Sequence, residues 1–378
     1  MKELPLAYRE RMKDLLGEDF AAYEAALRED PVKAYRVNTA KISVAADSTV
    51  TLDGDLEFAA NETVYVCHSV AAGGVFAVTG DIIATPQQTT YVAACVTMSI
   101  DGTISARGLV SNGSLDEGFG LARGQQDSHV QWLIGDHGIS GTTSLVLGNR
   151  SNVAATITAA ADFVVSAEII QYRSLTFNTG GHTITLGAGT SEKSGGISGN
   201  VNENQGVTGV TTIAGAGKVI VNYNVNDLTS DANPKANPFT VASGATLAFN
   251  PGADIGTGAL KVKSGGTLEI SSGTTTFDSL TVEDGAILGF NFTERKVAPA
   301  LSVATSATLP PSVAVKVSAA DGIRPKGGSY QLTSSNGAFT GATVSLAAGA
   351  PDWVKGVAVV DGEIVLEAKP VGFQLIVR

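Results

Sequence analysis

The sequence is poor in cysteine, in aromatic residues and in charge. Aromatic residues make up 6% of the chain and charged residues 16%. The two cysteines, Cys67 and Cys95, are too few for a disulfide framework or a metal-binding array. Both lie in strand-like apolar surroundings, where we expect small core residues, with one disulfide between neighbouring strands as the alternative.

Long apolar runs are also missing from the sequence. It contains no stretch of 18 consecutive apolar residues, so it predicts no membrane-spanning helix. Its first residues are polar and charged rather than basic and then apolar, so they do not predict a signal peptide. Glycine is abundant instead, with 44 residues in 378, which is typical of a chain with many turns.

Charge is spread unevenly along the chain. Residues 1–42 hold eight basic and eight acidic side chains, and the remaining residues hold 17 basic and 28 acidic ones, which is the whole net charge of −11. A nucleic-acid interface needs clustered Lys or Arg to contact phosphates. The acidic composition of residues 43–378 therefore argues against nucleic-acid binding by this part of the chain.

Residues 1–42 are predicted to form a small helical segment. Apolar residues recur at helical spacing up to Gly17, which is typical of a helix end, and recur again up to Asp30-Pro31. The following run, "AYRVNTAKIS", indicates an extended strand. Two short helices bury little apolar surface, so we expect this segment to be marginally stable by itself.

The run "LPLAYRERMKDLLGEDFAAYEAALREDP…AYRVNTAKIS" resembles the N-terminus of bacterial ribosomal-RNA cytosine-C5 methyltransferases of the Nol1/Nop2/Sun group. The resemblance covers residues 4–43 and implies a role in RNA binding. The catalytic domain of that family is missing: Cys67 and Cys95 follow Val66 and Ala94, not Pro and Thr, and no Gly-rich turn leads into a helix. We therefore expect no methyltransferase activity, and regard the segment as a displaced or chimeric N-terminus or a cap.

A repeated phrase organises the rest of the chain. Four segments starting near residues 239, 260, 280 and 301 follow the pattern apolar-x-Val-x-x-Gly-x-x-Leu, with Ser306 in place of Gly in the last. Their valines are Val241, Val262, Val282 and Val303, at steps of 21, 20 and 21 residues. Residues 42–52 and 56–66 repeat the phrase at a step of 14.

This phrase predicts a parallel β-helix with about 20 residues in each rung. Apolar residues at every second position give one buried strand face, and Gly or Asx allows the tight turn to the next strand. Stacked units share a continuous core that one unit could not build alone. A large up-and-down β-sandwich is the alternative, although sandwiches rarely keep such a register over four units.

The repeats resemble the autotransporter-associated β-strand repeats of bacterial surface proteins, and residues 328–372 resemble the closing segment of such passenger domains. This resemblance is specific over 239–372 and holds in style over 43–238. It implies a right-handed, single-stranded parallel β-helix displayed at the cell surface as a stalk or adhesin. The repeats of that family share no catalytic residues.

One polar stretch raises the question of an enzyme. "WLIGDHGISG" (132–141) resembles a Trp-Ile-Asp-His phrase of pectate lyases, and "LARGQQDSHVQW" lies just before it. A lyase would need Ca²⁺ held by several carboxylates, with Arg or Lys as the base, and this stretch offers one Asp. We interpret it as a polar loop between rungs in which His137 caps a turn. Four residues remain as weak candidates for a glycan contact: Arg123, Asp127, Asp136 and His137.

The sequence thus predicts a helical segment over 1–42 and a β-helix repeat domain over 43–378, with loops near 187–200 and 224–238. We expect a non-enzymatic bacterial surface or secreted protein without catalytic residues, cofactor or metal, whose partners are surface glycans or proteins of a host or bacterium. Two alternatives remain: a fragmentary RNA-binding module in residues 1–42, and a β-helix protein of the polysaccharide-binding or lyase type. The composition predicts cell-surface or extracellular localisation only through the resemblance.

Overall fold

The computed structural model describes a defined set of residues: 13, 43–58, 69–84, 99–100, 102–111, 119–120, 129–142, 145–146, 154–171, 174–187, 197–199, 210–222, 238–251, 253 and 259–370. The chain divides into two compact units, Met1–Asn38 and Thr39–Arg378. In the first unit only Lys13 is described, in helical conformation. The other residues of the predicted helical segment, as well as Cys67 and Cys95, lie outside the described residues.

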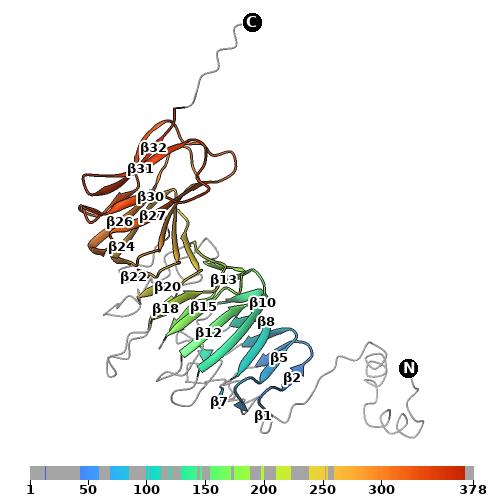
Figure 1. The fold of residues 1–378 in the computed structure, drawn as a ribbon. Helices are drawn as coiled ribbons and strands as arrows, with labels where there is room; N and C mark the ends of the chain where they lie inside the picture. The colour runs from blue at the N-terminus through green and yellow to red at the C-terminus, as the bar shows by residue number, and fades with distance from the viewer. Residues whose placement is uncertain are drawn as a thin grey trace. The chain divides into compact units, whose positions relative to one another are not determined.

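The second unit is all-β, and every element assigned among its described residues is a strand. Two long series of strands pair in parallel, each strand with its counterpart one rung later (Figure 1). The four strands β8, β10, β24 and β26 are long enough to run from one series into another. This long parallel sheet of sequence-alternating strands is consistent with a β-solenoid, and parallel pairing excludes the up-and-down sandwich for these strands.

The first series, called face 1, contains β2 (Thr49–Leu52), β5 (Val75–Val78), β8 (Thr103–Ser111), β10 (His129–Gly141), β12 (Ala154–Ala159), β15 (Leu175–Asn178), β18 (Thr211–Ala214), β20 (Phe239–Val241), β22 (Ala259–Val262), β24 (Gly273–Val282) and β26 (Pro299–Thr308).

The second series, called face 2, contains β3 (Leu56–Phe58), β6 (Asp81–Ala84), the ends of β8 and β10, β13 (Phe163–Val165), β16 (Thr183–Leu186), β19 (Lys218–Val221), β21 (Thr246–Phe249), β23 (Thr267–Ser271), β25 (Ile287–Phe292), β27 (Ser312–Ala319) and β30 (Thr343–Leu346).

Shorter parallel sheets complete the rungs. One contains β1 (Ser43–Val44), β4 (Ser69–Val70) and β7 (Ser99–Ile100), and another β9 (Phe119–Gly120), β11 (Leu145–Val146), β14 (Ile169–Gln171) and β17 (Ile197–Gly199). Strand β17 falls inside the range 187–200 that was expected to be a loop. The first part of β26 also pairs with β29 (Thr333–Ser334).

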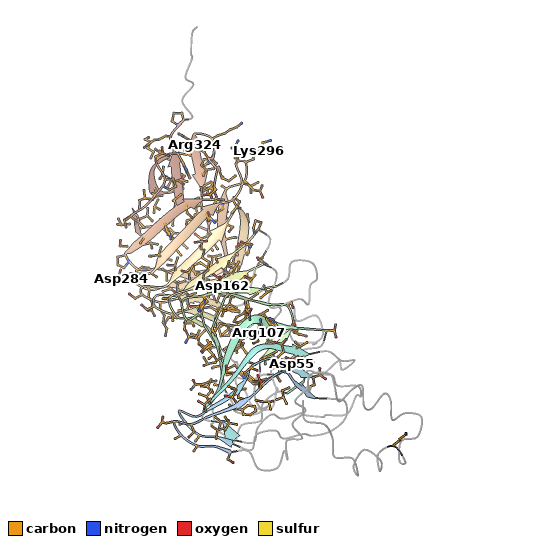
Figure 2. All side chains as sticks on the ribbon, turned by 90° about the vertical axis from the view of Figure 1, so that its right-hand side faces the viewer. Asp55, Arg107, Asp162, Asp284, Lys296 and Arg324 are labelled. Atoms are coloured by element: carbon orange, nitrogen blue, oxygen red, sulfur yellow. The ribbon has the colours of Figure 1, made fainter. Side chains whose placement is uncertain are left out.

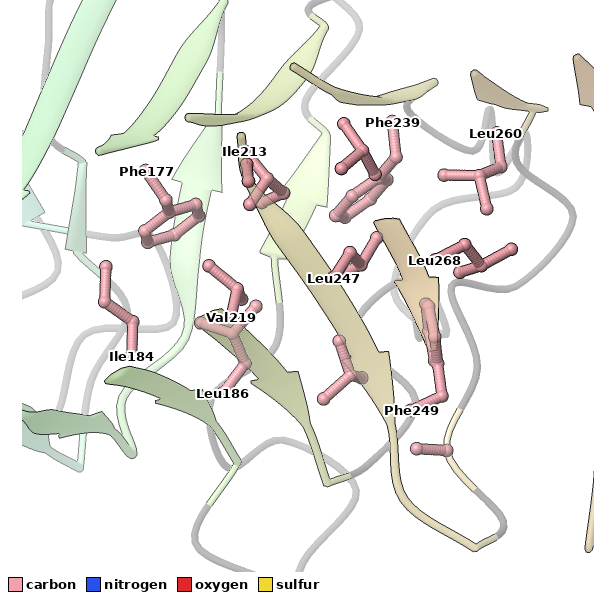
Figure 3. Close-up of a cluster of buried hydrophobic side chains, with 14 of the residues drawn as sticks. Phe177, Ile184, Leu186, Ile213, Val219, Phe239, Leu247, Phe249, Leu260 and Leu268 are labelled. Atoms are coloured by element: carbon pink, nitrogen blue, oxygen red, sulfur yellow. The ribbon is translucent and has the colours of Figure 1, made fainter. Parts of the chain in front are cut away.

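The core follows from the period of two in each strand. Side chains at alternate positions point inwards, and the parallel register places them directly above one another. One such column contains Leu186, Val221, Phe249, Ile270 and Phe290, each at most 1% exposed (Figure 3). Burial of a side chain of this size contributes roughly 1.5–3 kcal/mol, so the column joins successive rungs into one core.

The register confirms the repeat over three units and corrects it at the fourth. Val241 pairs with Val262, and Val262 with Val282. Val303, however, pairs with Phe277, because β24 and β26 are long strands that add residues to the rung. The expectation of about 20 residues in each rung is also too narrow: Ala155 pairs with Leu175, 20 residues on, but Leu175 pairs with Thr211, 36 residues on.

The repeated glycine forms the turn between faces 1 and 2. Gly244, Gly265 and Gly285 have φ values of 78°, 74° and 78°, which L-residues with a Cβ rarely adopt. The stacked turns are joined by hydrogen bonds, since the N–H of Gly244 donates to the carbonyl of Gly265 at 2.9 Å. The Gly in the sequence phrase is therefore required by the backbone.

The C-terminal end of the unit has a different, antiparallel sheet in the order β28 (Gly328–Gln331), β32 (Glu363–Ala368) and β31 (Val354–Val360). It joins the parallel core through Phe292, whose ring contacts Trp353 and Tyr330 edge-on at 5.3 and 5.6 Å between centroids. Such a sheet covers the last apolar rungs, as capping repeats do in other solenoids.

Candidate functional site

A bulge in β10 brings the candidate residues Asp136 and His137 to the surface. Ile134 pairs with Ala106 of β8 and Gly138 with Gly108, so three residues of β10 lie opposite the single residue Arg107. Extra residues in one strand bend it and redirect side chains. Asp136 and His137 are therefore exposed, although both lie inside a strand rather than in the expected loop.

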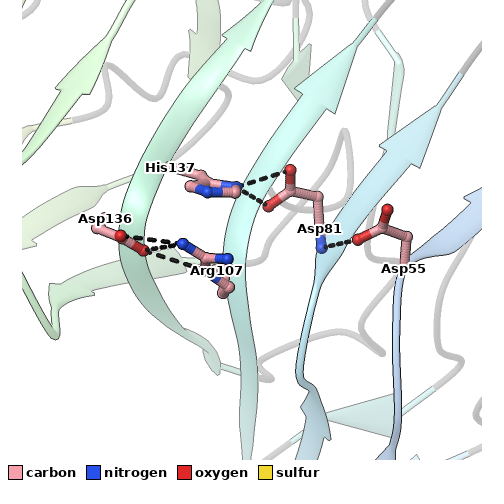
Figure 4. Close-up of polar contacts among 5 residues, drawn as sticks. All are labelled: Asp55, Asp81, Arg107, Asp136 and His137. Atoms are coloured by element: carbon pink, nitrogen blue, oxygen red, sulfur yellow. Dashed lines mark hydrogen bonds and ion pairs between the residues drawn. The ribbon is translucent and has the colours of Figure 1, made fainter.

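Asp136 is held by Arg107, the residue opposite the bulge. The Nε and Nη2 atoms of Arg107 donate to Oδ1 of Asp136 at 3.2 and 3.1 Å, and Nη2 also donates to Oδ2 at 3.0 Å (Figure 4). These hydrogen bonds lower the pKa of Asp136 below its ordinary value. The carboxylate thus stays ionised near neutral pH, and it is not poised to donate a proton.

His137 reaches past one strand to contact Asp81. Its Nδ1 atom lies 2.9 and 3.0 Å from the two carboxylate oxygens of Asp81 (Figure 4). Between them lies Gly108, which pairs with Asp81 on one side and with Gly138 on the other. A Cβ on Gly108 would lie 2.8 Å from the Cβ of His137 and 3.0 Å from Oδ1 of Asp81. Glycine leaves the room that this contact requires.

Asp81 is tied in turn to the preceding rung. Its backbone N–H donates to Oδ1 of Asp55 at 2.8 Å. The same arrangement recurs further along the chain, where the N–H of Thr183 donates to Oδ1 of Asp162 at 2.8 Å and His182 lies 3.5 Å from that oxygen. In both places an aspartate before a strand receives the N–H that begins the matching strand of the next rung.

The structure thus brings together two of the four candidate residues and adds three others. We call Asp55, Asp81, Arg107, Asp136 and His137 the inter-rung cluster (Figure 4). Arg123 and Asp127 lie outside the described residues. Asp55, Asp81 and Arg107 were missed by the sequence analysis, although successive steps of 26 residues separate them and match the length of these rungs.

A second polar centre surrounds Glu363 in the C-terminal sheet. Its carboxylate accepts hydrogen bonds from Thr333 Oγ1 at 2.7 Å, from Ser335 N and Oγ at 2.8 and 2.9 Å, and from Gly337 N at 3.0 Å. Burial acts to raise the pKa of Glu363, but these hydrogen bonds outweigh it and hold the pKa below its ordinary value. The carboxylate fixes the turn at 335–337 to β32.

Exposed charged side chains are spread over the described part of the unit, among them six that Figure 2 labels: Asp55, Arg107, Asp162, Asp284, Lys296 and Arg324. Within the described residues no group of three or more His, Cys, Asp or Glu side chains could hold a metal ion. The same residues contain no helix with the length and apolarity needed to cross a bilayer.

No protein-family model matches the sequence, and no curated protein matches it either. The functional argument therefore depends on the fold and on the contacts of the two polar centres.

Proposed function

We propose that the chain is a non-enzymatic β-solenoid protein of the bacterial cell-surface type, a passenger-like stalk or adhesin. The observation that carries this proposal is the use of the inter-rung cluster: its ionisable side chains pair with one another across successive rungs. Asp136 is neutralised by Arg107, and His137 contacts Asp81. A group engaged in this way joins strands and has no free base or acid for a substrate.

The stacked core supports a mechanical role for the same unit. Parallel rungs bury a continuous set of apolar columns, and each rung contacts mainly its neighbours. We propose that the coil is right-handed and single-stranded, since parallel strands joined by crossovers have that hand in nearly all proteins. Such a unit holds a ligand-binding loop away from an anchoring point without chemistry of its own.

The resemblance of residues 239–372 to autotransporter-associated repeats supports the location. We propose that the protein acts at the cell surface or outside the cell, and that its partners are surface glycans or proteins of a host or bacterium. Loops that leave the rungs are the proposed contact sites, because loops between regular elements commonly carry recognition in scaffold proteins.

Surface exposure on the source cells tests this proposal. An antibody raised against residues 259–370 should label intact cells, and protease added outside should remove the label while a cytosolic marker survives. An antigen found only in the cytosol after fractionation would overturn the proposal.

Polysaccharide cleavage is tested with the purified full chain. We expect no unsaturated uronate to accumulate at 235 nm, the usual absorbance of lyase products, from pectin or alginate with or without Ca²⁺. Cleavage that disappears in Asp136→Asn or His137→Gln, while both variants keep the wild-type circular dichroism, would establish the lyase alternative instead.

A further inference from the structure

The C-terminal sheet has an edge strand that pairs on one side only. Among the described residues β31 pairs with β32 and with no other strand. The edge is apolar from Val357 to Val360, and Val360 is 50% exposed. An uncovered apolar edge of this kind is a template for a further strand.

Two valines of β31 face the core without being covered on the outer side. Val357 pairs with Leu366, and Val359 with Ile364. Opposite residues in antiparallel strands point to the same face, and Leu366 and Ile364 are both 0% exposed. Val357 and Val359 are therefore core residues, yet they are only partly buried. A strand added at the edge would complete their burial.

We propose that this edge binds the same edge of a second copy of the chain, forming a two-fold symmetric, antiparallel β31–β31 interface centred on Ala358. In that register Val357 lies opposite the partner's Val359, and Gly356 opposite the partner's Val360. Symmetry repeats each contact, so both pairs of half-covered valines are buried together.

Charge complementarity selects the second copy as the occupant. The same register places Lys355 opposite the partner's Asp361, twice in the dimer. Lys355 is 66% exposed and uses one N–H to contact Glu367 at 2.6 Å, so further N–H donors remain for a partner carboxylate. A strand with cation and anion at its two ends is complementary to its own antiparallel copy.

Other registers do not fit. A shift by one residue places Val357 opposite the partner's Ala358, which points to the other face of its own sheet. Centring the pair on Val357 places Lys355 opposite the partner's Val359 and turns a charge towards apolar side chains. The register centred on Ala358 alone matches valine with valine and charge with charge.

The interface is short, because the register shift between Val354 and Gly356 limits regular pairing to Gly356–Val360. An interface of this size lies below the area of stable complexes, so the dimer should form reversibly with concentration. Since the two copies use the same surface, the association closes at two subunits instead of growing into a fibre.

Sedimentation velocity of the full chain over a concentration series tests the proposal. The wild type should shift from monomer to dimer. Ala358→Glu places two carboxylates across the symmetry axis and should leave monomer at every concentration, whereas the matched control Ala358→Ser should dimerise like the wild type. Ala358 is exposed, so circular dichroism of all three should agree. Asp361→Asn, which suits the left-handed turn, should weaken the dimer severalfold and reduce its salt dependence.

Crosslinking gives a second readout. In the background Cys67→Ser and Cys95→Ser, Ala358→Cys should form an oxidised dimer, because residues opposite each other in antiparallel strands have Cα atoms about 4.5–5.5 Å apart, within disulfide reach. Ser329→Cys, on the other edge strand β28, should stay monomeric under the same oxidation. A wild type that is monomeric throughout, equal dimerisation of Ala358→Glu, species larger than dimers, or equal crosslinking at Ser329→Cys would each overturn the proposal.

Discussion

The Nδ1 atom of His137 lies 2.9 Å from Oδ1 of Asp81, although strand β8 lies between the strands that carry them. The contact depends on two features of the backbone. The bulge in β10 turns His137 outwards, and Gly108 leaves space over β8. A pair of exposed groups would ordinarily contribute little to stability, so the main energetic effect is expected at the glycine.

We predict that Gly108→Ala destabilises the unit by about 1–3 kcal/mol, the usual effect of forcing an extra carbon into a filled space. The new Cβ would lie 2.8 Å from the Cβ of His137 and 3.0 Å from the carbonyl oxygen of Gly138, so the bulge or β8 must shift. Equilibrium unfolding in urea measures the change.

Gly356→Ala is the matched control, since a Cβ there would meet no atom within 4 Å. This variant should unfold within about 0.5 kcal/mol of the wild type, or slightly later, because alanine restricts the unfolded chain. Equal destabilisation by both variants would mean that the space above Gly108 is not the cause.

Glu363 should make the stability of the C-terminal sheet depend on pH. Its pKa in the folded protein lies below the ordinary value, so its contribution is present above the unfolded-state pKa of roughly 4.3 and is lost as the pH falls through the folded-state pKa. We predict that Glu363→Gln lowers stability by about 2 kcal/mol at pH 7, the usual value of hydrogen bonds to a charged group.

The measurement is urea unfolding of wild type and Glu363→Gln between pH 3 and 7, followed by the fluorescence of Trp353, which is on the same cap. The difference between the two proteins should shrink towards pH 3, as the wild-type carboxylate becomes protonated. Glu367→Gln is the control, since Glu367 is half exposed and contacts Lys355 on the outer side. A constant difference across the pH range would contradict the role given to Glu363.

The repeat phrase predicted the fold well where local sequence alone determines it. Alternating apolar residues and a turn glycine define a parallel rung, and the register at Val241, Val262 and Val282 follows the predicted steps. The fourth step failed at Val303 because the length of β24 and β26 depends on how the chain crosses between faces, a property of the stacked rungs. Sequence spacing cannot show this without the neighbouring rung.

The inter-rung cluster was predictable only in part. Asp136 and His137 stand out as polar residues in an apolar run, but their partners Arg107 and Asp81 are ordinary surface residues of earlier rungs. Their proximity depends on the bulge in β10, which adds two residues opposite Arg107. Bulges leave no reliable local signal in a sequence, so the pairing could not be foreseen.

The ion pair between Lys218 and Glu269 should respond unequally to loss of either member. Lys218 Nζ lies 2.8 Å from Glu269 Oε1, and the side chains are 35% and 10% exposed. Lys218→Ala leaves the more deeply buried carboxylate without its cation and should cost about 3 kcal/mol, as for broken buried pairs. Glu269→Ala leaves a lysine that can extend into water, and should cost less.

Urea unfolding of both single variants and the double variant measures this asymmetry. The double variant should be more stable than Lys218→Ala, because it removes the uncompensated carboxylate. The exposed pair Lys261–Glu283, at 2.8 Å, serves as the comparison, and its single variants should each change stability by less than about 1 kcal/mol. Equal effects at Lys218 and Glu269 would contradict the part given to burial.

Trp132 provides the sharpest test of the core. Its side chain is 0% exposed and lies in register with Ile104 and Ile157, while Nε1 has no hydrogen-bond partner among the described residues. A buried, unpaired N–H costs about 1–3 kcal/mol, which partly offsets the gain from the large ring. We therefore predict that Trp132→Phe costs less than about 1.5 kcal/mol, since it removes the N–H together with part of the volume.

Trp132→Ala removes the ring altogether and should cost about 3–5 kcal/mol. Phe177→Leu, in an adjacent rung and without any polar side-chain atom, gives the cost of a similar loss of volume alone, expected near 1 kcal/mol. If Trp132→Phe proves much more costly than Phe177→Leu in the same urea titration, the indole N–H makes a favourable interaction in solution. If the two costs are similar, the ring acts through its volume, and the core of this rung tolerates an unpaired donor because the stacked isoleucines on both sides fix the ring in place.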